Sequence, residues 1–337
     1  MENKLNKYKY KIIRNGLNKI YTYKYNKYLQ IGGDREKYKK FLLNILQNIT
    51  TCYTQQIGNT TFCNFTQTLC SCDNKLKIIK LIAKASNSVY LCEILNDCDY
   101  ESVFLEKSSA KVAVKFCDLD EFTCSIANEV INMLKYSMFA INNICSNYLY
   151  FFGYVNKCKN IFVNNQEYFS ATDTDDISCT ISEYIDGETL DSFVVSNKKL
   201  SIRQIFEYMY SVLCSLICLG YFIDDIHPDN IMVCDSKQKS IIEIYDKYYI
   251  FDDTNTIKII DYQTIGKTTL INVIINIKNF IDNSFYEKII EYLRIYVNEE
   301  EQLKNLNILF PDNYKEKITD GMLETTPSII KFDKIIL

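Results

Sequence analysis

The chain has 337 residues, of which 47% are apolar, so it is long and hydrophobic enough for two modest globular domains. Its 14 cysteines are scattered over a length that needs no disulfide staples, and no apolar leader precedes them, so a reducing, cytoplasmic location is expected. The net charge of −4 hides an asymmetry, because residues 1–50 hold 12 basic and 3 acidic side chains, whereas residues 171–261 hold 7 basic and 17 acidic ones.

Residues 1–76 are rich in Lys, Tyr and Asn, and we interpret them as a partly ordered N-terminal extension with one short helical pattern at residues 38–46. Lysines interleaved with tyrosines suit weak contact with an anionic membrane or with nucleic acid. A codon bias toward AT-rich codons and a solvated tail explain the same composition more simply. Both interpretations remain open.

The period of the apolar residues changes after Lys77 and becomes typical of strands. It predicts three antiparallel strands at residues 78–83, 88–95 and 111–116. A helix is expected over residues 124–136, and further strands over residues 148–155 and 179–184. This part of the chain is therefore predicted to be a small sheet that carries one helix.

Helical spacing dominates after Leu190. Apolar residues recur every three or four positions from Ile202 to Leu219, which predicts a helix buried along one face. The longest apolar run, about residues 210–223, is too short to cross a bilayer, so no transmembrane segment is expected. Strands are predicted at residues 231–234, 241–245, 248–251 and 257–261, followed by helices near 268–283 and 285–298.

Two residues of the first part have the types and spacing needed to hold a nucleotide. Phosphoryl transfer requires phosphates held in line, their charge neutralised and the accepting hydroxyl oriented. Lys115 ends the apolar strand Val-Ala-Val-Lys, which resembles the kinase pattern Val-Ala-Ile-Lys, in which alternation directs the ammonium toward the nucleotide. The alternative is a lysine that ends an apolar strand and is simply solvated. Glu129 follows fourteen residues later on the predicted helix, at a spacing that allows it to pair with Lys115.

The second part supplies a candidate catalytic loop, Asp-Ile-His-Pro-Asp-Asn. Asp225 stands five residues before Asn230, and an apolar strand follows, which is the spacing of a kinase catalytic loop. Asp225 would accept the proton of the substrate hydroxyl, while Asn230 and Asp261 would bind metal. His227 is expected to hold the loop by hydrogen bonds. The alternative is a turn rich in Asp and Asn between a helix and a strand.

Taken in order, these residues resemble the protein kinase superfamily across about residues 77–300. The resemblance implies a bilobal α+β fold that binds ATP with Mg²⁺ or Mn²⁺. Its N-lobe would be small and rich in strands, with one main helix and the hinge, over residues 77–185. Its C-lobe, over residues 186–337, would be mainly helical and abbreviated, because only 76 residues follow Asp261.

The same resemblance assigns nucleotide contacts to two segments. In the hinge-like sequence Ser-Glu-Tyr-Ile-Asp-Gly, the backbone groups of Glu183 and Ile185 would meet adenine. A segment without glycine stands where a glycine-rich loop would cover the phosphates, which weakens its backbone contacts. The residues of this segment are Ile82, Ala83, Lys84, Ala85, Ser86, Asn87, Ser88 and Val89.

The chain departs from the kinase pattern at two further motifs. Ile223 and Asp224 replace the His and Arg that precede the catalytic Asp, and Tyr262 and Gln263 replace the Phe and Gly that follow the metal-binding Asp. Control by a phosphorylated activation loop, which depends on that Arg, is therefore not expected.

Among divergent kinases the chain is most similar to the poxviral virion serine/threonine protein kinase family. This similarity implies an enzyme that phosphorylates protein hydroxyls, with viral membrane and core proteins as substrates, a role in virion assembly and packaging in the virion. Two alternatives remain. A small-molecule kinase similar to aminoglycoside and choline kinases shares the Asp-x-His-Pro-Asp-Asn loop, and a pseudokinase scaffold would tolerate the missing glycines.

Overall fold

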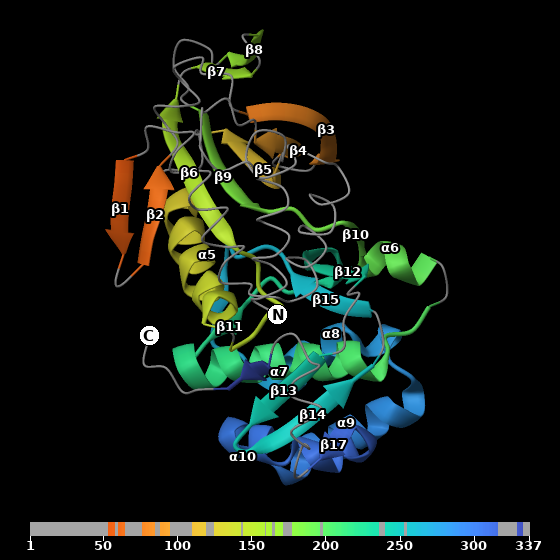
Figure 1. Cartoon of the computed structure of the whole chain (residues 1–337). Coiled ribbons are helices and arrows are strands. Elements are labelled where there is room, and N and C mark those ends of the chain that lie inside the picture. The colour runs from red at the N-terminus through yellow and green to blue at the C-terminus, as the bar shows by residue number, and fades with distance from the viewer. Residues whose placement is uncertain are drawn as a thin grey trace, which may run out of the picture. The chain divides into compact units, whose positions relative to one another are not determined.

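The computed structural model describes most of the chain from residue 76 onward and two short strands before it (Figure 1). The described residues are 53–57, 60–64, 76–84, 88–94, 110–118, 125–142, 144–158, 160–163, 166–170, 177–195, 198–235, 240–252, 255–315 and 329–332. The predicted helix at residues 38–46 lies outside them. The chain divides into two units, one formed by Met1–Leu134 and Tyr150–Tyr184, the other by Lys135–Leu149 and Ile185–Leu337.

The first unit is built on a seven-stranded sheet with the order β1-β2-β6-β9-β5-β4-β3 (Figure 1). Its strands are β1 (Tyr53–Ile57), β2 (Thr60–Asn64), β3 (Leu76–Lys84), β4 (Ser88–Ile94), β5 (Ala110–Asp118), β6 (Phe151–Cys158) and β9 (Ile177–Glu183). All neighbours pair antiparallel except β2 and β6, which are parallel. The strands β1 and β2 were not predicted. A separate hairpin joins β7 (Asn160–Val163) to β8 (Gln166–Ser170).

Strand β5 shows why this sheet positions Lys115. Val112, Val114 and Phe116 are buried, whereas Ala113 and Lys115 are half-buried, as the two-residue period of a strand requires. The helix α5 (Ser125–Ile141) follows β5 and is longer than the predicted helix. Its buried residues include Glu129, Val130, Met133 and Leu134.

The second unit surrounds helix α7 (Ile202–Leu219), whose bounds are those predicted. Local signals fix both ends. Ser201 and Gln204 form a capping box at the start, and Gly220 ends the helix in the left-handed conformation with φ of 75°. Of the described helices, α7 alone is long and apolar enough to cross a membrane, and 72% of its apolar window is buried inside the protein, as in the core helix of a folded domain.

Three small sheets share this unit with the helices. Their strand orders are β10-β12-β15, β11-β16 and β17-β14-β13-β18. The strands are β10 (Gly187–Thr189), β11 (Phe222–Ile223), β12 (Ile231–Asp235), β13 (Ser240–Ile244), β14 (Lys247–Phe251), β15 (Asn255–Ile259), β16 (Ile265–Gly266), β17 (Tyr314–Lys315) and β18 (Ile329–Lys331). The described elements thus form a mixed α+β fold.

Four helices remain among the described residues, and the sequence pattern predicted two of them. They are α6 (Leu190–Val195), α8 (Leu270–Asn276), α9 (Asn283–Ile295) and α10 (Glu299–Lys304). The pattern predicted one helix near 268–283, but α8 ends at Asn276, and a single 3-10 turn, Lys278–Phe280, follows. Asp282 fixes the start of the next helix, because as the N-cap of α9 it has an extended backbone and accepts hydrogen bonds from the amides of Ser284 and Phe285.

Candidate functional site

An ion pair in the first unit joins β5 to α5. Lys115 Nζ lies 3.0 Å from Glu129 Oε1, at the fourteen-residue separation that suggested the pairing. The side chain of Glu129 is 3% exposed and that of Lys115 is 17% exposed. A buried carboxylate is stable only with a charged or hydrogen-bonding partner, so Glu129 fixes the ammonium where β5 presents it.

The predicted phosphate-covering segment, residues 82–89, includes the end of β3 and the start of β4. Lys84 pairs with Ser88 and Ala83 with Val89, and the register shifts between Leu81 and Ala83. The side chains of Ile82 and Ala83 are exposed. Ala85, Ser86 and Asn87 lie outside the described residues. The described part of the segment is therefore a pair of antiparallel strand ends.

The predicted hinge begins at the end of β9. Glu183 pairs with Val112 of β5, and its amide donates to the carbonyl of Tyr150 at 2.8 Å. The amide of Tyr150 in turn lies 3.3 Å from Glu183 Oε2. Glu183 is thus fastened to the residue that precedes β6 by both its backbone and its side chain. Ile185 is half-buried and is the first residue of the long C-terminal segment of the second unit.

In the second unit, the catalytic-loop sequence forms a tight turn between β11 and β12. Asn230 is buried, and its Nδ2 atom donates to the carbonyl of Asp225 at 2.8 Å and lies 3.2 Å from His227 Nε2. These two contacts fix the amide plane and turn the Asn230 oxygen away from the loop. The carboxylate of Asp225 is 74% exposed, so a substrate hydroxyl can reach it.

His227 bridges the carboxylates of its own loop. Its Nε2 atom lies 4.0 Å from Asp225 Oδ2, and its Nδ1 atom lies 3.8 Å from Asp229 Oδ2. The contact with the Asn230 amide agrees with the expectation that His227 holds the loop by hydrogen bonds.

Asp261 is tied to the same region by backbone bonds. Strand β15 ends at Ile259, two residues earlier than the predicted strand, and the Ile260 amide donates to the Asn230 carbonyl at 2.9 Å. Asp261 Oδ1 accepts from the Gln263 amide at 3.1 Å. Beyond it, the Asp224 amide donates to the Thr264 carbonyl at 3.1 Å. The second unit therefore gathers Asp225, Asn230 and Asp261 where β12 begins and β15 ends.

Two of the predicted site residues carry oxygen atoms of the kind that a magnesium or manganese nucleotide takes as protein ligands. Among the described residues, no three His, Cys, Asp or Glu side chains gather as a metal site. Mg²⁺ is usually held by one or two protein oxygens together with phosphates and water. The amide oxygen of Asn230 and the carboxylate of Asp261 are ligands of this kind.

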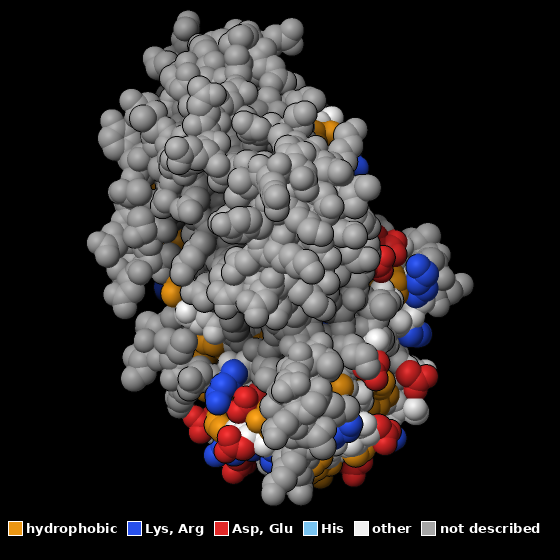
Figure 2. Space-filling model, viewed as in Figure 1, with side chains coloured by type: hydrophobic (Ala, Val, Ile, Leu, Met, Phe, Trp, Pro, Cys, Tyr) orange, Lys and Arg blue, Asp and Glu red, His pale blue; other side chains and the backbone are white. Residues whose placement is uncertain are grey.

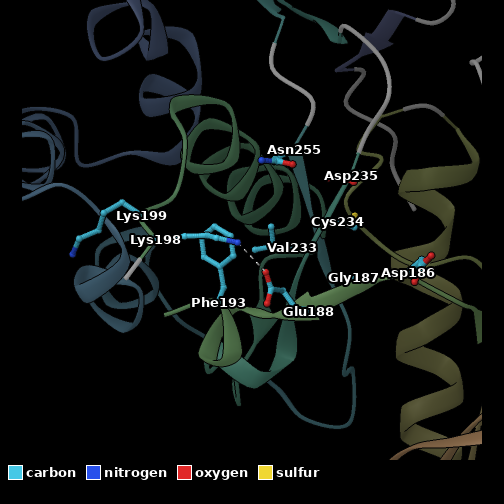
Figure 3. Close-up of a pocket in the computed structure, with 10 residues that line it drawn as sticks. All are labelled: Asp186, Gly187, Glu188, Phe193, Lys198, Lys199, Val233, Cys234, Asp235 and Asn255. Atoms are coloured by element: carbon cyan, nitrogen blue, oxygen red, sulfur yellow. Dashed lines mark ion pairs between the residues drawn. The ribbon is translucent and has the colours of Figure 1, made fainter. Parts of the chain in front are cut away.

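A groove of about 820 Å³ lies elsewhere in the second unit, and none of the predicted site residues lines it (Figure 3). Lys198 crosses it, with its Nζ atom 3.6 Å from Glu188 Oε1 and 5.0 Å from the centre of the Phe193 ring. Its lining residues are Asp186, Gly187, Glu188, Phe193, Lys198, Lys199, Val233, Cys234, Asp235 and Asn255. No sequence motif predicted this groove, because its walls come from separate elements.

The described side chains of the second unit that are visible in Figure 2 carry charges of both signs. On the face shown in Figure 2, described acidic and basic side chains alternate with hydrophobic ones instead of gathering by sign. Among the side chains described on this face, no single-sign patch of the kind that favours binding to a nucleic acid backbone is seen. The basic extension to which membrane or nucleic-acid contact was assigned lies in residues 1–76, outside the described residues except for β1, β2 and Leu76.

A comparison with models of known protein families gives no match for this chain, and a comparison with curated proteins gives none either.

Proposed function

We propose that this chain is an ATP-dependent phosphotransferase of the protein-kinase-like class, and specifically a divergent serine/threonine protein kinase. The observation that carries the proposal is the 3.0 Å ion pair between Lys115 and Glu129. A lysine on a strand that pairs with a helical glutamate is the arrangement that protein kinases require for activity. The expected bilobal fold belongs to this proposal, with the N-lobe over residues 77–185 and an abbreviated C-lobe over residues 186–337.

Each site residue has a physical role in this proposal. Lys115, held by Glu129, binds the α- and β-phosphates, and Asn230 and Asp261 bind the metal ion. Mg²⁺ or Mn²⁺ bound with ATP neutralises the charge of the phosphates. Asp225 orients the substrate hydroxyl and takes its proton, while the bond from the hydroxyl oxygen to the γ-phosphorus forms and the bond from that phosphorus to the bridging oxygen breaks.

The backbone of the site supports these roles by fixing the groups before substrate binds. The Asn230 amide is oriented by Asp225 and His227, and Asp261 is oriented by the Gln263 amide. Preorganised groups need no reorganisation during the reaction, which is the main source of electrostatic catalysis. Adenine would meet the backbone of Glu183 and Ile185, and the segment of residues 82–89 would cover the phosphates.

The test is transfer of labelled phosphate from ATP to protein, with Mg²⁺ or Mn²⁺, by the whole chain. Lys115→Met and Asp225→Asn should each lower the rate by at least about 100-fold. Lys111→Met changes an exposed lysine of the same strand, and Asp312→Asn an exposed acid outside the site, so both should keep the rate of the unmodified chain. Transfer that survives Asp225→Asn would refute the assignment, and nucleotide binding without any transfer would identify a pseudokinase scaffold.

One observation favours a second candidate, a kinase that phosphorylates a small molecule. Only eight residues separate Asp261 from Leu270, where α8 begins. Protein kinases hold their activation loop between the metal-binding Asp and the following helices, and so short a connection leaves little chain for that loop. A panel of amino-alcohols and sugars separates the candidates, because turnover of one of them with no transfer to protein would favour the small-molecule enzyme.

The biological setting is a further part of the proposal. It follows from the similarity to the poxviral virion kinases noted from the sequence, and it comprises a cytoplasmic kinase of virion assembly that acts on viral membrane and core proteins and is packaged in the particle. Detection of the chain in purified particles, with loss of phosphate from particle proteins in an Asp225→Asn virus, would test it.

A further inference from the structure

Tyr262, the residue after Asp261, is anchored by its hydroxyl. Its side chain is 1% exposed. The hydroxyl donates to the carbonyl of Ile259 at 2.6 Å and accepts from the amide of Leu149 at 2.8 Å. The first bond closes a short loop around Asp261, and the second ties this loop to a segment 113 residues away in the sequence.

Aromatic packing holds the ring as firmly as the hydroxyl. The ring centre of Tyr262 lies 5.2 Å from that of Tyr136 and 6.5 Å from that of Tyr148, and both neighbours are fully buried. Each neighbour also has a hydrogen bond of its own, from Tyr136 to Ser215 and from Tyr148 to the carbonyl of Ser211. Tyr262 is therefore part of a cluster of buried tyrosines in which every ring is oriented by its hydroxyl.

Further backbone bonds fasten the chain on both sides of Asp261. Before it, the Ile259 amide donates to the Asn147 carbonyl at 2.8 Å, and the Asn147 side chain donates to the Ile257 carbonyl at 2.8 Å. After it, Ile265 pairs with Ile223 in the β11–β16 ladder. The segment that carries Asp261 is thus held by bonds to residues 147, 149 and 223.

Displacement of Tyr262 would break two hydrogen bonds at once. The buried amide of Leu149 and the carbonyl of Ile259 would lose a partner, and the phenol itself would have to find new partners. Each buried polar group left without a bond lowers the population of the displaced state by about ten- to a hundredfold. In protein kinases the aromatic residue at this place is Phe, which has no hydroxyl, and its packing distinguishes active from inactive states.

We propose that the Tyr262 hydroxyl locks Asp261 in one metal-binding position, so that this site lacks the switch provided by a mobile aromatic residue. Tyr262 is then a positioning residue, and the enzyme is active without a signal that rearranges this segment. The inference rests on the proposed function for its meaning, because Asp261 binds metal only in that proposal. The lock itself is a property of the free protein and can be measured without nucleotide.

The first experiment is hydrogen exchange on the whole chain without ligand, comparing Tyr262→Phe with the matched control Tyr148→Phe. Both variants remove one buried hydroxyl from the same cluster. Tyr262→Phe should raise the exchange rate at residues 149 and 259–263 by about tenfold or more, while Tyr148→Phe should not. Equal exchange at these residues in both variants would overturn the lock. If Tyr262→Phe does not fold, hydrogen exchange in the unmodified chain is the test. Rapid local exchange of the amide of residue 149 in that chain would also refute the lock.

The second experiment measures the rate of binding of a fluorescent ADP with Mg²⁺. A locked site should give an observed rate that rises linearly with nucleotide concentration, whereas Tyr262→Phe should add a slow step that makes the rate level off. A purely structural role for the hydroxyl would leave the linear dependence unchanged in the variant, and that result would refute the lock. Failure of the unmodified chain to bind ADP would refute the proposed function, whereas the exchange result would still decide the lock.

Discussion

Replacement of Glu129 by Gln is the sharpest test of the ion pair, because it removes one charge and keeps the size of the side chain. Loss of one partner of a buried ion pair typically costs about 3 to 5 kcal/mol. Here Lys115 is 17% exposed, so water can compensate in part, and the Gln amide oxygen can still accept its hydrogen bond. We therefore expect the free energy of unfolding to fall by about 1 to 2 kcal/mol.

The effect of Glu129→Gln on transfer should exceed its effect on stability. An ammonium that is no longer held can shift by about an ångström, and such misplacement costs about a hundredfold in rate. We expect kcat/KM for ATP to fall by that factor, measured by labelled phosphate transfer, while urea unfolding gives the stability. Glu188→Gln is the control, because its pair with Lys198 is exposed and should contribute less than about 1 kcal/mol.

A double variant completes this test. If Glu129 acts only through Lys115, then adding Glu129→Gln to Lys115→Met should lower kcat/KM no further. Additive losses in the double variant, or an activity of Glu129→Gln equal to that of Glu188→Gln, would refute the assignment of Glu129 as the residue that positions Lys115.

Three further predictions concern stability. Glu207→Gln should lower the free energy of unfolding, measured by urea unfolding, by about 3 kcal/mol. Glu207 is 1% exposed, and its carboxylate accepts a hydrogen bond from Arg203 Nε at 2.9 Å. Gly187→Ala should lower the free energy of unfolding by about 1 to 3 kcal/mol, because a Cβ atom there would clash with the backbone carbonyl of Val233 in β12; an unchanged urea midpoint would contradict this contact. The hydrogen bond from the Ser284 hydroxyl lowers the pKa of Asp282 below its ordinary value of 3.8, so its contribution to stability is present above that pH and is lost as the pH falls through the lower folded value. Asp282→Asn keeps a capping side chain but should remove this part of the pH dependence, as acid unfolding curves would show.

The helix α7 shows which parts of the fold the sequence can predict. Its apolar period, the capping pair Ser201 and Gln204, and the terminal Gly220 are all local signals, and its predicted bounds are confirmed. The predicted helix near residues 268–283 was wrong in its length, because the apolar period continues across Asp282, which caps the next helix instead of lying inside one. Local chemistry decides helix ends, and periodicity alone does not reveal it.

The candidate site also has one part that the sequence predicts and other parts that it does not. The pairing of Lys115 with Glu129 was predictable, because a strand that ends in Lys and a glutamate on the following predicted helix match the order of these residues in kinases. The anchoring of Tyr262 was not predictable, since its partner Leu149 is distant in sequence. Leu149 contributes only its backbone amide, and a backbone amide leaves no pattern in the sequence. The groove beside Lys198 was missed for the same reason, because its walls meet only in the folded chain.

The Lys115–Glu129 pair also bears on whether this site binds a nucleotide. Buried ion pairs contribute little to stability, and replacing one by apolar residues of similar size is often neutral or stabilising. Stability therefore does not explain why a carboxylate that is 3% exposed stands at position 129. The pair is explained if the partly exposed ammonium must stay charged and fixed for a ligand that reaches it, and phosphate is the ligand that such an ammonium suits. A scaffold that bound only protein partners would need neither charge, so the pair favours nucleotide binding, which an enzyme and a nucleotide-binding pseudokinase would share.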